Sequence, residues 1–199
     1  GPGALHMSGA VANTYTGDTV VEGGRLVLEK TVVNGSINGD LYLRRYPGNG
    51  DAKLENNAQI SSGSRITVET DCTFDMNNIN ESFGSLAGSG LVELGSGNMS
   101  VLDNTSSTYA GLIEGSGIVR KYGSGTFTLE GNNSYTGNTE VRNGILLING
   151  SQSGSDVVVF SGGTLGGLGT MGAINSFGQV APGTSAGQLG CANATMQTG

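Results

Sequence analysis

Tryptophan is absent from this chain of 199 residues, and cysteine, histidine and proline occur only two, one and three times. Two cysteines are too few for a disulfide framework, so we predict that Cys72 and Cys191 remain unpaired thiols. The only histidine, His6, lies near the N-terminus, which leaves neither cysteine a nearby base for nucleophilic catalysis. No apolar run reaches the ~18–20 residues that a transmembrane helix requires.

Basic residues are also scarce, because nine Lys and Arg stand against sixteen Asp and Glu and give a net charge of −7. This balance argues against nucleic acid or an anionic membrane as a partner. Basic residues occur side by side in two doublets, Arg44–Arg45 and Arg120–Lys121. Neither extends into a run, so we interpret both as solvated strand faces.

Glycine is the abundant residue, with 37 copies that separate short runs rich in Val, Leu, Ile and Thr. These runs alternate with period two and predict an all-β chain. The expected strands are Thr19–Val21, Arg25–Leu28, Thr31–Val33, Asp40–Leu43, Arg65–Val68, Leu91–Leu94, Met99–Leu102, Ile118–Lys121, Thr126–Leu129, Thr139–Val141, Ile145–Ile148 and Val157–Phe160.

One phrase occurs twice at an offset of 120 residues, as NTYTGDTVVEGGRLVL at 13–28 and NSYTGNTEVRNGILLI at 133–148. Such self-similarity is typical of a solenoid. Strands of three to five residues, few aromatics and Gly-rich corners favour a right-handed, single-stranded parallel β-helix over a sandwich. At roughly 20–24 residues per coil it would have about eight or nine coils.

We expect this β-helix to form one domain over residues 8–199. Residues 1–7, GPGALHM, look like the remnant of an expression tag and are left out of the predicted fold. Residues 44–58 are the least repeat-like and are predicted to loop out from the rod.

Residues 123–148 resemble the autotransporter-associated β-strand repeat, also called the passenger-associated transport repeat, with residues 13–28 as a second copy. The family pattern is G-x-G-T-L-T-L-x-G-x-N-x-Y-x-G-x-T-x-V-x-x-G-x-L. The chain matches it at Gly123, Gly125, Thr126, Thr128, Leu129, Gly131, Asn133, Tyr135, Gly137, Thr139, Val141, Gly144 and Leu146, with Phe127 where Leu is usual. Residues 82–104, 162–172 and 180–189 resemble neighbouring coils of such passengers, whereas 30–80 match poorly.

The repeat residues have a structural interpretation that needs no ligand. We predict that Gly137, matched by Gly17, occupies a corner with φ > 0. Tyr135 is expected to cover apolar surface at that corner while its hydroxyl stays in water.

Candidate chemistry is confined to one acidic group, Glu69, Asp71 and Asp75, in VETDCTFD. Within one strand the spacing i, i+2, i+6 would place all three on one face, where an ion or glycan site is conceivable. We favour an exposed polar face instead. No phosphate, redox or zinc motif is present, so the sequence predicts no catalytic residue, no cofactor and no metal site.

The resemblance implies a secreted or surface-displayed bacterial passenger, attached through an outer-membrane β-barrel that lies outside this sequence. We expect a non-catalytic stalk or adhesin whose partners are a host-surface glycan, a matrix protein or further copies of itself. The alternative is a β-helical polysaccharide lyase or hydrolase, which would need aligned carboxylates in a groove. A third possibility is a binding module that uses the excursion at 44–58.

Overall fold

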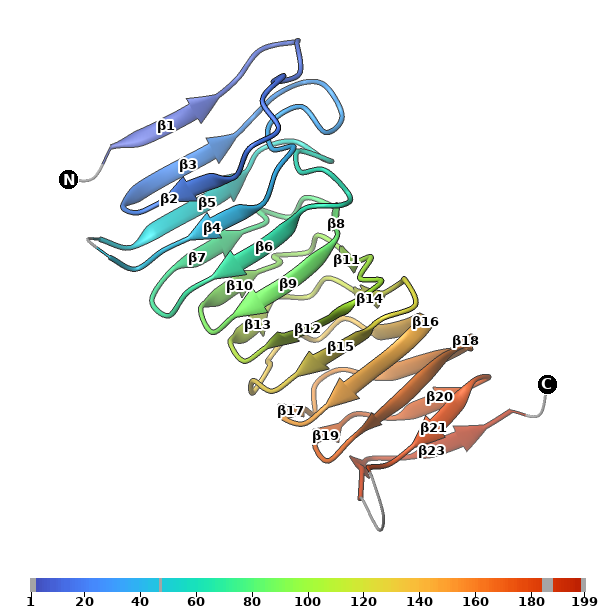
Figure 1. The fold of residues 1–199 in the computed structure, drawn as a ribbon. Helices are drawn as coiled ribbons and strands as arrows, with labels where there is room; N and C mark the ends of the chain where they lie inside the picture. The colour runs from blue at the N-terminus through green and yellow to red at the C-terminus, as the bar shows by residue number, and fades with distance from the viewer. Residues whose placement is uncertain (1–2, 47, 184–187, 198–199) are drawn as a thin grey trace.

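The computed structural model describes residues 3–46, 48–183 and 188–197, and the chain there forms a parallel β-solenoid of about nine turns (Figure 1). All regular elements in these ranges are strands, and every strand pair is parallel. In the same ranges no helix is long and apolar enough to cross a membrane. The predicted all-β solenoid is therefore confirmed.

Each coil contributes strands to three faces, which we call face 1, face 2 and face 3. Face 1 is a six-stranded sheet of β1 (Ala4–Met7), β3 (Gly24–Leu28), β5 (Gly50–Leu54), β7 (Thr73–Asp75), β10 (Leu91–Glu93) and β13 (Leu112–Glu114). Asn133 and Ser134 connect it to a three-stranded sheet of β17 (Ser151–Gln152), β19 (Thr170–Met171) and β22 (Gly190–Cys191).

Faces 2 and 3 share one 14-stranded sheet, because β16 (Thr139–Ile148) and β18 (Val157–Gly167) bend around a corner and belong to both. Face 2 also holds β8 (Glu81–Phe83), β11 (Met99–Val101), β14 (Val119–Lys121), β20 (Ile174–Ser176) and β23 (Ala194–Met196). Face 3 also holds β2 (Thr19–Val21), β4 (Leu41–Leu43), β6 (Arg65–Val68), β9 (Ser85–Gly88), β12 (Ser106–Tyr109), β15 (Thr126–Leu129) and β21 (Gln179–Ala181).

The register sets the length of each coil. Stacked partners are separated by 18 residues between Phe74 and Val92 and by 26 residues between Leu26 and Ala52. In Figure 1 the face-3 strands run in front and the face-1 strands run behind them in the opposite sense, which gives a right-handed winding from the N-terminus to the C-terminus.

One continuous apolar core runs along the solenoid axis. Alternate residues of each short strand point inward, so equivalent residues of successive coils stack on one another. Phe74 exemplifies this, because it lies between Ala52 and Val92 on face 1 and packs edge-on against Phe83, with ring centroids 6.2 Å apart. At roughly 1.5–3 kcal/mol for each large side chain, this burial is the main stabilising term.

Side-chain oxygens complete the stacking at corners, where the chain has no strand. The Oδ1 atoms of Asn57, Asn80 and Asn98 accept hydrogen bonds from the amides of Asn80, Asn98 and Ile118, respectively, each at 2.8–3.0 Å. Each asparagine thus binds the coil that follows it, which explains the frequency of Asn between the predicted strands.

All but one of the strands expected from the sequence are present, and three expectations are corrected. Residues 31–33 form no strand, because the chain turns there and Asn34 adopts a φ of 50°. Residues 44–58 do not all loop out, because Ala52 and Leu54 alternate inward and make β5 a regular rung of face 1. Residues Ala4–Met7, left out of the predicted fold, form β1 and pair with β3.

Candidate functional site

The acidic group predicted from the sequence does not form one site. Glu69 follows β6 on face 3, whereas Asp75 lies on β7 of face 1, because the chain turns a corner between them. Asp71 occupies that corner with a φ of 66°. The assumption of a single strand through Glu69, Asp71 and Asp75 was therefore wrong.

The hydrogen bonds and ion pair of these carboxylates stabilise the turns of the coil. Arg45 binds two of them, through its amide to Glu69 Oε2 and through its Nε to Asp71 Oδ2, both at 3.1 Å. Asp75 Oδ1 accepts a hydrogen bond from the Asn77 amide and caps the turn after β7. No catalytic pair of carboxylates results from this arrangement.

Asp75 instead belongs to a row of stacked acids that the linear sequence conceals. Registers on face 1 place Asp75 beside Glu93 and Glu93 beside Glu114, with Lys53 next to Asp75. Burial, followed by repulsion from Asp75 and Glu114, raises the pKa of Glu93. Among the described residues no group of His, Cys, Asp or Glu has the arrangement of a metal site.

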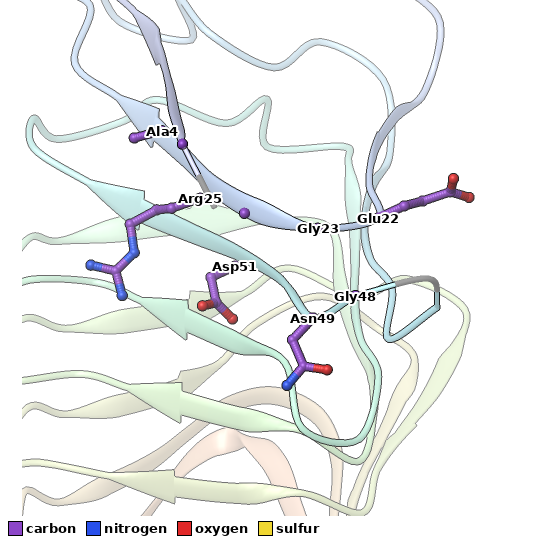
Figure 2. Close-up of a pocket in the computed structure, with 9 residues that line it drawn as sticks. Ala4, Glu22, Gly23, Arg25, Gly48, Asn49 and Asp51 are labelled. Carbon is purple, nitrogen blue, oxygen red and sulfur yellow. The ribbon is translucent and has the colours of Figure 1, made fainter. Parts of the chain in front are cut away.

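A hollow of about 1010 Å³ lies beside face 1 near the N-terminal end (Figure 2). Arg25 and Asp51 project from neighbouring positions of β3 and β5 into this region, whereas Glu22 points away from them. Glu22 is engaged by Arg44 at 3.6 Å, and the remaining lining is mostly glycine backbone. The hollow therefore presents no nucleophile with a base beside it.

The tyrosine of the repeat is buried, contrary to the expectation that its hydroxyl would stay in water. Tyr135 has no exposed surface, and its Oη lies 2.6 Å from Thr139 Oγ1 and 2.9 Å from Gln152 Oε1. Thr139 Oγ1 also contacts Gln152 Nε2 at 3.0 Å and Ser155 Oγ at 2.9 Å. Burial raises the pKa of Tyr135 to about 12. A closed polar network inside the coil thus replaces water as the partner of the hydroxyl.

The glycine of the same motif has a different role from the predicted one. Gly137 is not among the positive-φ residues, but a Cβ placed on it would lie 2.1 Å from the Gly117 carbonyl oxygen of the coil beneath. The residue is therefore glycine because two backbones approach closely. The positive φ occurs seven residues later, at Gly144 (68°), and at its counterpart Gly24 (76°).

The two basic doublets differ in their exposure to solvent. Arg44 and Arg45 are exposed, as predicted. Lys121, however, is 1% exposed and stacks inside the core between Val101 and Val141, so its interpretation as a solvated residue was wrong. Its Nζ donates to the carbonyl oxygens of Asp103, Tyr122 and Gly123, which supply the partners that water would otherwise provide.

Both cysteines are free thiols, in agreement with the prediction. Cys72 is buried and Cys191 is exposed. Burial raises the pKa of the Cys72 thiol, which keeps it protonated and unreactive at neutral pH.

Comparison with known proteins identifies the repeat. The family model of the passenger-associated-transport-repeat matches residues 1–28 and 119–148, which include both copies of the phrase found in the sequence. An extracellular serine protease of Serratia marcescens is 47% identical over 79 residues, which are 39% of this chain and 8% of that protein. The adhesin BmaC autotransporter of Brucella suis biovar 1 (strain 1330) is 44% identical over 87 residues, or 41% of this chain and 2% of the adhesin.

A second extracellular serine protease of Serratia marcescens is 42% identical over 64 residues, which are 32% of this chain and 6% of that protein. No solved structure matches the chain. The matched segments thus cover a small share of each relative. The chain thus carries two matches to the passenger-associated transport repeat on a parallel β-solenoid, and its matched segments resemble parts of an autotransporter adhesin and of extracellular serine proteases.

Proposed function

We propose that this chain is a non-catalytic shaft of a secreted or surface-displayed passenger, which holds other regions of its parent protein away from the cell and takes part in adhesion. In this proposal the parent is anchored by a separate outer-membrane domain. Any proteolytic activity, such as the names of the Serratia relatives indicate for those proteins, resides outside the repeat.

One observation carries this proposal: the central glycines and the tyrosine of the repeat serve the coil itself. Gly137 permits close contact between coils, Gly144 makes the positive-φ corner, and Tyr135 closes a buried network. These side chains are therefore not available for chemistry. Within the acidic group that the sequence suggested, Glu69 and Asp75 lie on different faces.

Adhesion and self-association form the binding part of the proposal, with a host-surface glycan, a matrix protein or a second copy of the chain as partner. Sedimentation velocity over a concentration series should show weak, reversible association. Coated beads should adhere to glycan or matrix surfaces more than beads carrying an unrelated β-protein. Monomeric behaviour together with no adhesion would refute this part.

The non-catalytic part has its own test. We expect no turnover of pectin, alginate or host-type glycans by the purified chain. Turnover of any polysaccharide that Asp71→Asn or Asp75→Asn abolishes would overturn the shaft and establish an enzyme.

A further inference from the structure

The face-2 sheet is interrupted at one level of the solenoid. Its ladder begins at β8, and the only pairing before it is an isolated bridge between Ile37 and Ile60 within the described residues. Faces 1 and 3 continue through the same level, where Ala52 pairs with Phe74 and Arg65 with Ser85. The interruption therefore opens one side of the rod without breaking the stack.

A side chain fills the place of the missing backbone partner. Glu81 is 2% exposed, and its Oε2 accepts a hydrogen bond from the Gln59 amide at 2.6 Å while its Oε1 accepts one from the Ser82 amide at 2.9 Å. Because a carboxylate is interposed between the two coils, their backbones cannot pair directly. The left-handed conformation of Ala58, with a φ of 51°, accompanies this detour.

The interruption creates a cavity of about 330 Å³, which we call the face-2 notch. Asn80, Ser82, Asn98, Ser100 and Arg120 line it together with Glu81. Ser82, Ser100 and Arg120 are consecutive outward positions of β8, β11 and β14, so they form one column along the rod. The volume is at the small end of the range for ligand cavities, about 300–1,000 Å³.

Hydrogen-bond donors predominate in the notch. The Oδ1 atoms of Asn80 and Asn98 are already occupied by amides of the next coil, whereas their Nδ2 groups donate to no described residue. The hydroxyls of Ser82 and Ser100 likewise contact no described polar group. A ligand rich in acceptor oxygens would satisfy these groups.

The charge beside the notch is unusual for this acidic chain. Arg120 and Arg142 share one carboxylate, Glu140, through Nε at 3.0 Å and Nη2 at 2.8 Å, which leaves one positive charge in excess. The only acid in the lining is Glu81, whose two oxygens already accept amides. Burial raises the pKa of Glu81 to about 7, which reduces its negative charge. The Nη groups of Arg120 remain available for an anion.

We propose that the face-2 notch binds an acidic saccharide of the uronate class, with Arg120 taking the carboxylate and the Asn and Ser column taking ring hydroxyls. The proposal rests on the adhesive function above and specifies a ligand class for it. A saccharide fits better than a phosphate group, because a single guanidinium is surrounded by neutral donors over three successive rungs. The described lining holds no aromatic side chain on which a nucleobase could stack, so its neutral donors fit ring hydroxyls better.

The test is a titration of the ¹⁵N-labelled chain with trigalacturonate, followed through backbone amide shifts. We expect saturable shifts at Ser82, Ser100 and Arg120, and none with the fully methyl-esterified trisaccharide, which has the same shape without charge. Arg120→Gln should weaken binding at least about tenfold, since it removes charge-assisted hydrogen bonds. Arg45→Gln is the control, because this exposed arginine pairs with Asp71 and does not line the notch. It should leave the affinity within about twofold.

Three results would overturn the proposal: no shifts at the notch, equal binding of the esterified trisaccharide, or full competition by equimolar inorganic phosphate, which would indicate a general anion site. If Arg120→Gln does not fold, the double variant Ser82→Ala/Ser100→Ala takes its place and should weaken binding measurably. Loss of uronate binding alone would leave the shaft intact. Adhesion of the coated beads that survives in Arg120→Gln would separate the two proposals, because it would place adhesion elsewhere on the rod.

Discussion

At the scale of single residues, the two copies of the repeat are a natural comparison. Gly17 and Gly137 occupy equivalent positions, yet a Cβ on Gly17 would meet nothing within 4 Å, whereas one on Gly137 would meet the Gly117 carbonyl. The same pattern therefore places one glycine in a tight contact and the other in open space. Similarity of sequence predicted a shared corner, but the neighbouring coil decides whether the corner is crowded.

The first prediction concerns this pair. Gly137→Ala should lower the free energy of unfolding by more than about 1 kcal/mol, because the coils must separate to admit the methyl group. Gly17→Ala should be neutral or slightly stabilising, since alanine restricts the unfolded chain. Urea denaturation of both variants measures the difference. Equal effects would show that contact between coils is not what requires glycine.

Tyr135 and Tyr15 provide the second comparison. Tyr135 is fully buried, whereas Tyr15 is 36% exposed and donates from its hydroxyl to the Ser36 carbonyl oxygen at 2.9 Å. Tyr135→Phe leaves the buried Gln152 Oε1 without its donor, and we expect it to cost about 1–3 kcal/mol. Tyr15→Phe should cost less, because water can reach its site. The denaturation midpoints of the two variants are the measurement. Equal shifts would contradict the expected difference between the buried and the exposed tyrosine.

The third prediction concerns pH and Glu81. Burial raises the pKa of Glu81 from 4.5 to about 7 in the folded state, so the protonated form favours folding. The stabilisation is complete below pH 4.5 and is lost as the pH rises through about 7, by up to about 3 kcal/mol. Glu81→Gln should remove this part of the pH dependence. The measurement is the free energy of unfolding of the wild type and of Glu81→Gln between pH 4.5 and 7.5. If it changes with pH equally in both proteins, the pH dependence does not come from Glu81.

At the scale of the strand, period-two alternation located stretches such as Thr126–Leu129, which place one side inward wherever they stack, but fewer than half of the 23 described strands. It missed the two-residue strands β17, β19 and β22, which are too short to show a period, and also polar or charged strands such as β5 and β12. It also misjudged Lys121, since alternation places that residue inward but its charge suggested solvent. Only the carbonyl groups of a neighbouring coil make that burial possible.

Strand β14 offers the fourth prediction, because adjacent residues point in opposite directions. Lys121→Ala should destabilise by about 2–4 kcal/mol, since it leaves a cavity and three carbonyl oxygens without their donor. Arg120→Ala should cost at most about 1 kcal/mol, as its ion pair is near the surface and Glu140 retains Arg142. Thermal unfolding of both variants is the measurement. If Arg120→Ala lost more stability than Lys121→Ala, the assignment of Lys121 to the inner side of β14 and Arg120 to its outer side would be wrong.

The candidate sites could not be predicted from the sequence either, because their residues lie one coil apart in the chain. The row of Asp75, Glu93 and Glu114 and the column of Ser82, Ser100 and Arg120 each combine residues about one coil apart. Coil lengths between 15 and 26 residues prevent a fixed period from aligning them in advance. The acidic group that the sequence did suggest lay within seven consecutive residues, and a corner dispersed it. In a solenoid, proximity follows the register of the coils more than the order of the chain.

At the scale of the whole molecule, each coil contacts mainly its neighbours, so stability should follow the quality of successive interfaces. From β8 onward face 2 has a continuous ladder, whereas on the N-terminal side of Glu81 its only described strand pairing is the bridge between Ile37 and Ile60. There, side-chain bonds replace part of the ladder, such as those between Gln59 and the backbone of Lys30. The face-2 notch thus marks a boundary between the part with a face-2 ladder and the part without one.

Hydrogen exchange provides the last prediction. Amides of β11, β14, β16 and β18 should exchange slowest, and those of β1 to β5 should open at a lower free energy, because no face-2 ladder holds the N-terminal coils together. Glu81→Ala should widen this gap by removing the carboxylate that holds the Gln59 and Ser82 amides, and it should leave β16 and β18 almost unchanged. Uniform exchange along the rod, or loss of protection in β16 as large as in β5, would mean that the solenoid unfolds as one cooperative unit and that the notch is no boundary.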